Sequence, residues 1–200
     1  MGASSRSGRT TARELLEELL AKDRQVVAAC VDGRVVDLHT PIEVDPEVTV
    51  TPIRVNDDDA LPIIRHSAAH IMADAVQQLF PGTKVTIGPA TRAGFYYDFE
   101  RSEGTFSEED LGRIEEKMKT IAAGKHPFVR EVVSRQQAHQ LFADMGESYK
   151  RELIDAIAEG EEISLYRHGG DGSRWVDLCQ GPHVPHTGFL KAVKLISVAG

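Results

Sequence analysis

Cysteine is scarce in this chain of 200 residues, in which only Cys30 and Cys179 are present. Two thiols do not make a disulfide framework, and the first residues, MGASSRSGRTT, lack the apolar core of a secretion signal. Reduced thiols and a cytoplasmic location are therefore expected. Apolar runs are short as well, since none approaches the roughly 18 residues that a membrane-spanning helix requires. This excludes helical membrane proteins and predicts no membrane partner.

Positive charge is also in short supply. The 23 lysines and arginines stand against 31 aspartates and glutamates, which gives a formal net charge of −8. This balance argues against general, charge-driven binding of nucleic acid. The charge is uneven, because residues 101–162 are rich in Glu and Asp whereas residues 163–200 carry more basic than acidic side chains. Any polyanion is expected to dock at this C-terminal part. The charged residues there are Arg167, Arg174, Lys191, Lys194, Asp171 and Asp177.

Residues 1–55 are predicted to form a small α+β module. Thr11 and Glu14 make a capping-box pattern ahead of leucines at helical spacing, which predicts a helix over residues 12–22. Asp32-Gly33 lies between two apolar runs and predicts a β-hairpin over residues 25–40, with a further strand at residues 47–53. The acidic, proline-ended segment 54–62 predicts a linker and a domain boundary.

Residues 56–200 are predicted to form a second unit. Apolar periodicity and end signals predict helices over residues 63–80, 106–124, 134–146 and 147–160. Strands are predicted over residues 84–88, 94–100, 128–134, 163–169, 174–181 and 190–200. Because helices and strands are mixed without strict alternation, an α+β fold is favoured over a doubly wound one.

Three histidines and one cysteine carry the strongest chemical signal. Two of the histidines are four residues apart on the predicted helix 63–80, so their imidazoles emerge on one face. The cysteine and the third histidine are also four apart, but Gly181 and Pro182 between them forbid a helix and predict a compact loop. This set fits a tetrahedral zinc ion or a water molecule used in hydrolysis. The four residues are His66, His70, Cys179 and His183. No Glu follows His66, so the metalloprotease pattern His-Glu-x-x-His is absent.

Three stretches carry a family resemblance. They read HSAAHIMADAVQQLFPGTKVTIGPATRAGFYYDFE, GESYK and VDLCQGPHVPHTGFLKAVKLISVAG. Together they closely resemble the editing domain of bacterial-type threonyl-tRNA synthetases, which is shared in outline with alanyl-tRNA synthetases. The usual HSCAH motif reads HSAAH here, which leaves both histidines in place. GPATRAGFYYDFE resembles the threonyl version, and the glycine-rich motif of free-standing alanyl-type editors is not found.

The resemblance implies a domain order. Residues 1–55 resemble the small ubiquitin-like TGS module of these synthetases, and MGASSRSG stands where its first β-hairpin is expected, so the module is expected to be incomplete. Residues 56–200 resemble the editing domain, for which an α+β fold with a mixed or antiparallel sheet is implied. The chain stops at ISVAG, where the family continues into an aminoacylation domain, so an ATP site is expected to be absent from this chain.

The resemblance also implies an activity. Serine and threonine differ by one methyl group, which a binding pocket discriminates by only about 1–3 kcal/mol. The implied reaction is therefore hydrolysis of tRNA for threonine mischarged with serine, whereas threonyl-tRNA is excluded by its extra methyl group. His66 and His70 are expected to position or deprotonate the attacking water, and Cys179 and His183 to form the opposite wall.

Substrate contacts are implied for three more residues. Lys150 is expected to hold the terminal adenosine or its phosphate, and Asp177 to bind the aminoacyl ammonium or to orient His183. Tyr97 is expected to hydrogen-bond the substrate, whereas Tyr96, on the other strand face, is expected in the core.

No cofactor is expected to be required, although zinc on the His and Cys set is an open alternative because alanyl-type editors use this arrangement. The expected partner is the acceptor end of tRNA, and the parent synthetase is expected to be a homodimer. Two other functions stay open. One is an alanyl-type, zinc-dependent deacylase that acts in trans, and the other is a non-catalytic tRNA-binding module.

Overall fold

The structure is a computed structural model that describes residues 8–44, 47–170 and 175–199. The expectations that rest on MGASSRS, Asp171 and Arg174 concern residues outside these ranges. Helices and antiparallel sheets occur together, which confirms the α+β class. Among the described residues, no helix is long and apolar enough to cross a membrane.

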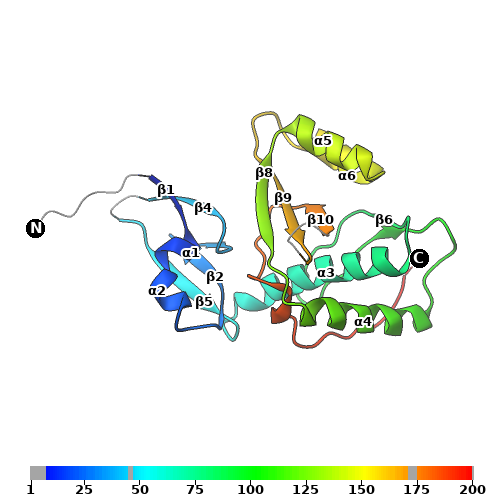
Figure 1. Cartoon of the computed structure of the whole chain (residues 1–200), viewed down its shortest axis with the longest axis horizontal. Helices are drawn as coiled ribbons and strands as arrows, with labels where there is room; N and C mark the ends of the chain where they lie inside the picture. The colour runs from blue at the N-terminus through cyan, green and yellow to red at the C-terminus, as the bar shows by residue number, and fades with distance from the viewer. Residues whose placement is uncertain (1–7, 45–46, 171–174, 200) are drawn as a thin grey trace, which may run out of the picture.

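Small antiparallel sheets form the N-terminal part of the molecule (Figure 1). β3 (Arg34–Val36), β2 (Val26–Val31) and β5 (Val50–Arg54) form one sheet in that order, and β1 (Gly8–Thr11) pairs with β4 (Pro41–Val44) in another. The predicted hairpin is confirmed, because Asp32 and Gly33 between β2 and β3 have φ angles of 48° and 82°, as a two-residue primed turn requires. Strands β1 and β4 were not predicted, since the polar stretch GRTT lacks apolar alternation.

The predicted helix over residues 12–22 is wrong in its continuity. It is two short helices, α1 (Ala12–Leu15) and α2 (Glu17–Leu20), separated by Leu16 with φ −103° and ψ 13°. The predicted capping box of Thr11 and Glu14 is present at the start of α1. Both helices lie against a small core that holds this part together. Its buried members are Ala12, Val26, Ala29, Val36, Leu38 and Ile42.

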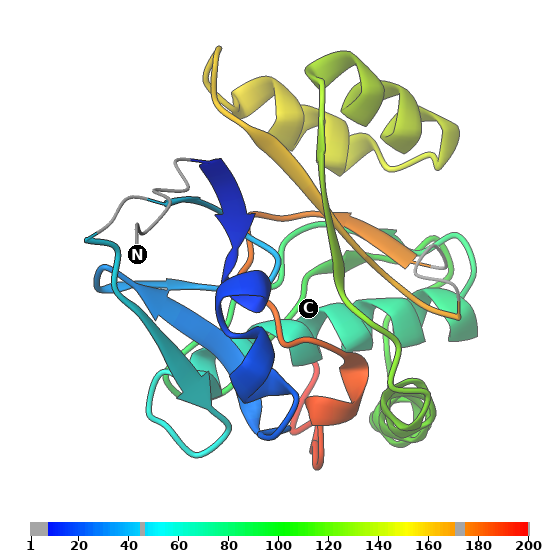
Figure 2. The same ribbon diagram turned by 60° about the vertical axis from the view of Figure 1, so that its left-hand side comes forward.

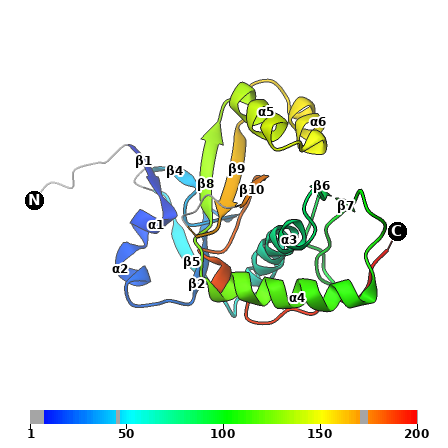
Figure 3. The same ribbon diagram turned by 45° about the vertical axis from the view of Figure 1, so that its right-hand side comes forward.

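The helix α3 (Ala60–Leu79) is the central element of the second part and packs beside α4 (Glu108–Ala123), as Figures 1 and 3 show. Ser107 caps α4 as predicted, by accepting a hydrogen bond from the backbone of Asp110. α3 begins three residues earlier than predicted, inside the expected linker. Side chains of β2 and β5 reach the core around α3, so the N-terminal part and the second part share one hydrophobic core. The domain division after residue 55 stays a prediction.

A three-stranded antiparallel sheet crosses above α3 in the order β10 (Trp175–Leu178), β9 (Ile163–His168), β8 (Val129–Val133). α5 (Arg135–Asp144) and α6 (Ser148–Ala156) connect β8 to β9 and stand at one end of the sheet (Figure 2). Of the strands predicted over residues 84–88 and 94–100, only β6 (Lys84–Val85) and β7 (Phe99–Glu100) form as strands, and Phe95 makes an isolated bridge to Ala90.

The strand predicted over residues 190–200 is wrong. After a short 3₁₀ helix, η1 (Thr187–Phe189), residues 190–199 form no strand and run beside α4. The backbone N–H of Leu195 donates to Glu115 Oε1 at 2.7 Å, and Val193 and Leu195 pack against the main core. The alternating apolar residues of this segment therefore pack against α4 and the main core, and the Glu115 carboxylate accepts a backbone hydrogen bond that a neighbouring strand would otherwise accept.

Candidate active site

The four predicted histidine and cysteine residues lie together. Two imidazoles project from adjacent turns of α3, and the loop that leaves β10 brings the thiol and the third imidazole against them. One ligand-type atom from each residue lies within 4.8 Å of those of the other three. The residues are His66, His70, Cys179 and His183.

The Cys179 thiol is at the centre of this set. Its Sγ lies 3.3 Å from His66 Nε2 and 3.3 Å from His183 Nε2, and the backbone N–H of Gly181 points to it at 3.2 Å. Gly181 has φ 76°, and a Cβ at this position would overlap the hydroxyl of Tyr166. The glycine therefore lets the chain turn back tightly from the thiol to His183.

Hydrogen bonds at the far ring nitrogens fix the orientation of two imidazoles. His66 Nδ1 lies 3.2 Å from the carbonyl oxygen of Pro182, which can only accept, so this nitrogen carries the proton. His183 Nδ1 lies 3.1 Å from Ser67 Oγ. Both rings in their neutral form therefore present an Nε2 lone pair toward Cys179.

Ser67 is a residue of this cluster that the sequence reasoning missed. Its hydroxyl donates to the carbonyl of Ile63 at 2.9 Å, and its lone pairs face the N–H of Val184 at 3.1 Å and His183 Nδ1. Because its proton is committed to Ile63, Ser67 accepts from His183 and fixes the Nδ1–H tautomer. A signal was present in the sequence, since the serine of HSAAH directly follows the first histidine.

The interior position keeps the site uncharged. Burial, followed by the neighbouring histidines, lowers the pKa of His70 and of His183 well below its usual value, and burial also lowers the pKa of His66. Burial raises the pKa of Cys179 to about 12, so the thiol is protonated at neutral pH. The site offers neutral imidazole lone pairs and a thiol that can donate to only one of them.

The three predicted substrate-binding residues form a closed network beside His70. Lys150 Nζ is 2.6 Å from Asp177 Oδ1, 2.6 Å from the carbonyl of Thr86 and 3.1 Å from Tyr97 Oη. Tyr97 Oη donates in turn to Asp177 Oδ2 at 2.7 Å. The three N–H groups of the ammonium are thus taken up inside the protein, and only 2% of Lys150 is exposed.

Asp177 lies beside His70, with 3.6 Å between Oδ2 and the histidine Nε2. Asp177 therefore contacts His70 on α3, whereas the residue that contacts His183 Nδ1 is Ser67. Tyr97 is buried, whereas the expectation of a core position for Tyr96 is wrong, because 50% of that residue is exposed. The short β7 does not extend to these tyrosines, so strand alternation does not set their direction.

A second buried pair, also missed from the sequence, lies behind the site. His168 Nε2 on β9 is 3.1 Å from Asp74 Oδ2, and Asp74 is one turn beyond His70 on α3. The ring of Phe128 contacts both His168 and His183, with centroid distances of 4.9 and 4.8 Å. This layer packs against the rear of the histidine cluster.

The donor set fits a zinc ion in kind and in spacing. Ligand atoms around a tetrahedral zinc lie about 3.3–3.6 Å apart, given bonds of about 2.0 Å to nitrogen and 2.3 Å to sulfur. The two measured sulfur–nitrogen separations are both 3.3 Å. Hydrogen bonds at the far nitrogens of His66 and His183 are also what ligating histidines usually have. Four protein ligands would complete the coordination shell, which is typical of structural zinc sites.

Comparisons with known proteins show which proteins the chain is similar to. The family model described as the threonyl and alanyl tRNA synthetase second additional domain matches residues 163–200, which include Asp177, Cys179 and His183. A threonine–tRNA ligase of Wolbachia sp. subsp. Drosophila simulans is 48% identical over 194 residues, covering 97% of this chain and 29% of the relative. That of Oleidesulfovibrio alaskensis is 49% identical over 190 residues, covering 94% and 28%, respectively.

Over nearly its whole length the chain is similar to an editing region of threonyl-tRNA synthetases. The resemblance found in the sequence is thereby confirmed, and the matched domain supports an editing role associated with the synthetase. A third relative, from Rhodospirillum rubrum, is 48% identical over 200 residues and covers 98% of this chain and 30% of its own length. The chain thus spans less than a third of the family members that it matches.

Proposed function

We propose that this site hydrolyses the ester of a mischarged aminoacyl-tRNA, namely tRNA for threonine carrying serine, and spares threonyl-tRNA. One observation carries the proposal: two imidazoles present Nε2 lone pairs to one thiol, which can donate its single proton to only one of them. The other nitrogen is then available to bind and deprotonate a water molecule. Water attacks the ester carbonyl, and the proton passes through the imidazole to the ribose oxygen that leaves.

We propose His66 as the nitrogen base, because its side chain is half-buried whereas His70 and His183 are enclosed. Neutral imidazole is the basic form, and the lowered pKa keeps His66 in that form at neutral pH. Cys179 is proposed to contact the water or the seryl group through its S–H. A covalent acyl-cysteine is not needed, and a protonated thiol is a poor nucleophile.

Lys150, Asp177 and Tyr97 are proposed to position His70 and to set the electrostatic field at the substrate's ammonium. The contacts of Lys150 with three internal acceptors argue for this role over direct binding of the terminal adenosine. The Asp177 carboxylate, 3.6 Å from His70 Nε2, favours a proton on that nitrogen, so Nδ1 of His70 carries the lone pair. Nδ1 of His70 has no hydrogen-bond partner in the described part of the chain.

The wider assignments belong to the same proposal. The acceptor end of tRNA is the proposed partner, the N-terminal part is proposed to be a TGS module, and the parent synthetase is proposed to be a dimer in the cytoplasm. A zinc ion, if bound, would be held by the three histidines and Cys179 and would act as a Lewis acid. We favour a site without metal, because four protein ligands would leave no open position for water.

Incubation of the purified chain with seryl-, threonyl- and alanyl-tRNA tests the proposal. Release of serine but little threonine is expected, and Cys179→Ala and His66→Ala should each lower the rate strongly. Equal release of both amino acids would contradict the exclusion of threonyl-tRNA, and no release would favour a non-catalytic tRNA-binding module. A preference for alanyl-tRNA, together with loss of activity and of zinc on chelation, would favour the alanyl-type alternative.

A further inference from the structure

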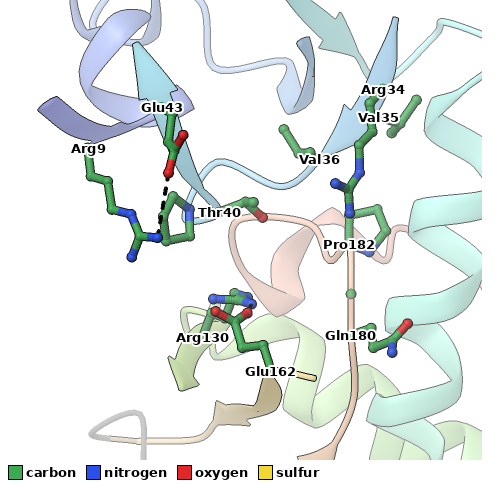
Figure 4. Close-up of a pocket in the computed structure, with 12 residues that line it drawn as sticks. Arg9, Arg34, Val35, Val36, Thr40, Glu43, Arg130, Glu162, Gln180 and Pro182 are labelled. Atoms are coloured by element: carbon green, nitrogen blue, oxygen red, sulfur yellow. Dashed lines mark hydrogen bonds and ion pairs between the residues drawn. The ribbon is translucent and has the colours of Figure 1, made fainter. Parts of the chain in front are cut away.

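We infer that a groove between the N-terminal part and the catalytic loop binds the phosphodiester backbone of the tRNA 3′ end, with Arg34 as its main contact. The inference rests on the proposed function and extends it to the substrate beyond its terminal nucleoside. The groove has a volume of about 360 Å³, which is within the usual range for ligand sites of about 300–1,000 Å³. It is lined by segments that are far apart in the sequence (Figure 4).

The position of the groove ties it to the reaction. Gln180, Gly181 and Pro182 form one of its walls, and these are the residues between the catalytic Cys179 and His183. An ester held at the thiol is attached to the last ribose of the tRNA, so the RNA strand that precedes this ribose must run from the site across the protein surface. The groove borders the site on that loop, with side chains from β1, β3, β4 and β8 around it.

Charge indicates which part of the nucleic acid the groove accepts. Arg9, Arg34 and Arg130 line it, against Glu43 and Glu162, so the lining is locally basic in a chain of net charge −8. Arginine presents several N–H donors in a planar fork that matches phosphate oxygens. Only Val35 and Val36 and two prolines supply bulky apolar surface among the lining residues, so a base-stacking platform of aromatic rings is not built here.

Arg34 is the arginine most available to a ligand. It is exposed, and within residues 8–44, 47–170 and 175–199 no hydrogen bond or ion pair of its guanidinium is present. Figure 4 shows its side chain reaching from β3 toward Pro182. Arg9 pairs with Glu43 at 3.7 Å with both side chains largely in solvent, and Arg130 pairs with Glu162. The exposed Arg9 pair is weak and exchanges readily for a phosphate, whereas only 10% of the Arg130 side chain is exposed, so that arginine is less free to leave Glu162.

This placement differs from the expectation that a polyanion docks at residues 163–200. The loop at Gln180 contributes backbone to the groove, but the cations come from the N-terminal strands and from β8. The N-terminal part would therefore bind substrate directly, in addition to its packing against α3.

Two substrates that differ only in phosphate test the inference. Seryl-tRNA has internucleotide phosphates next to its ester, whereas 3′-O-seryl-adenosine has none. Arg34→Ala should raise KM for seryl-tRNA roughly fivefold with kcat unchanged and leave seryl-adenosine hydrolysis unaltered. The slope of log(kcat/KM) against log salt should become less steep by about 0.7, the value for one contact to a single strand. Arg34→Lys should rescue part of the loss because it keeps the charge.

Arg24→Ala is the matched control, since Arg24 is exposed in the same N-terminal part and does not line the groove. It should leave both reactions unchanged. Equal effects of Arg34→Ala on the two substrates, or no effect on seryl-tRNA, would overturn the inference while leaving the hydrolase intact. If the wild-type chain hydrolyses neither ester, the proposed function fails on its own. Binding of a labelled, uncharged acceptor-stem RNA then decides, with the groove refuted if Arg34→Ala binds as tightly as Arg24→Ala.

Discussion

Replacement of Ser67 by alanine should disturb the site through a residue that does not face the thiol. In the native protein, Ser67 Oγ accepts from His183 Nδ1 and from the backbone N–H of Val184, and both groups are buried. Alanine leaves two donors without an acceptor, at about 1–3 kcal/mol each. The gain in helix propensity from serine to alanine, about 0.5 kcal/mol, offsets a small part. We expect the free energy of unfolding to fall by about 2–4 kcal/mol.

The catalytic effect should be separable from the loss of stability. Without Ser67, the proton of His183 is no longer held on Nδ1, so part of the population places it on Nε2, where it faces Cys179. Two-bond ¹H–¹⁵N correlation spectra of the imidazole report which nitrogen is protonated. Under conditions where the variant is fully folded, a mixed tautomer and a lower kcat for seryl-tRNA are expected.

Thr120→Ala is the matched control for Ser67→Ala. Thr120 also lies on a helix and donates to the carbonyl four residues earlier, Glu116, at 3.0 Å, but it is exposed. Its removal should change the free energy of unfolding by no more than about 0.5 kcal/mol in urea denaturation. The reasoning is refuted if Ser67→Ala is as stable as Thr120→Ala, or if His183 keeps its proton on Nδ1.

Three further perturbations have defined outcomes. Lys150→Ala should lower the free energy of unfolding in urea by about 3–5 kcal/mol, because it leaves the Asp177 carboxylate buried and unpaired. Lys84→Ala, which removes the exposed pair with Glu100, should lower it by at most about 1 kcal/mol. Similar losses for the two variants would contradict this. Gly181→Ala should destabilise more than Gly33→Ala, since both have positive φ but only the former has neighbours that a Cβ would overlap, and equal midpoints would count against the tight loop. His70 and His183 have pKa values in the folded protein below the unfolded value of about 6.5, so the unfolded chain binds more protons than the folded chain. The free energy of unfolding should therefore fall as the pH drops from about 7.5 to 5.5. A free energy of unfolding that stays constant or rises over that range would refute the burial of both histidines in their neutral form.

Local periodicity was enough to predict the parts of the site that depend on neighbours in sequence. His66 and His70 share a helix face because four residues make about one turn. The Gln-Gly-Pro segment could be recognised as a non-helical loop because glycine and proline restrict it to a turn. The Asp32-Gly33 hairpin follows from the same kind of local rule. Each of these is decided by a few adjacent residues.

Contacts between distant segments were not accessible in this way. His168 and Asp74 are 94 positions apart, and nothing in either local sequence indicates a buried partner. The predicted core position of Tyr96 was also wrong, because side chains alternate between faces only in a strand, and Tyr96 lies in the loop before β7. The C-terminal segment has strand-like alternation, but α4 and Glu115 satisfy it instead. Tertiary packing decided each of these cases.

The contact between Asp37 and Tyr166 bears most directly on how the site should be divided into domains. Asp37 belongs to the predicted N-terminal module and is buried, with Oδ1 accepting from the N–H of His39 at 2.9 Å and Oδ2 accepting from the Tyr166 hydroxyl. The Tyr166 ring lies 4.5 Å from that of His183 by centroids, and its hydroxyl closes the space behind Gly181. A buried carboxylate from one side of the predicted boundary thus supports the loop between Cys179 and His183 on the other. A cut after residue 55 would remove that acceptor and leave the tyrosine hydroxyl beside the loop without it, so the N-terminal part supports the proposed site through Tyr166 and Gly181.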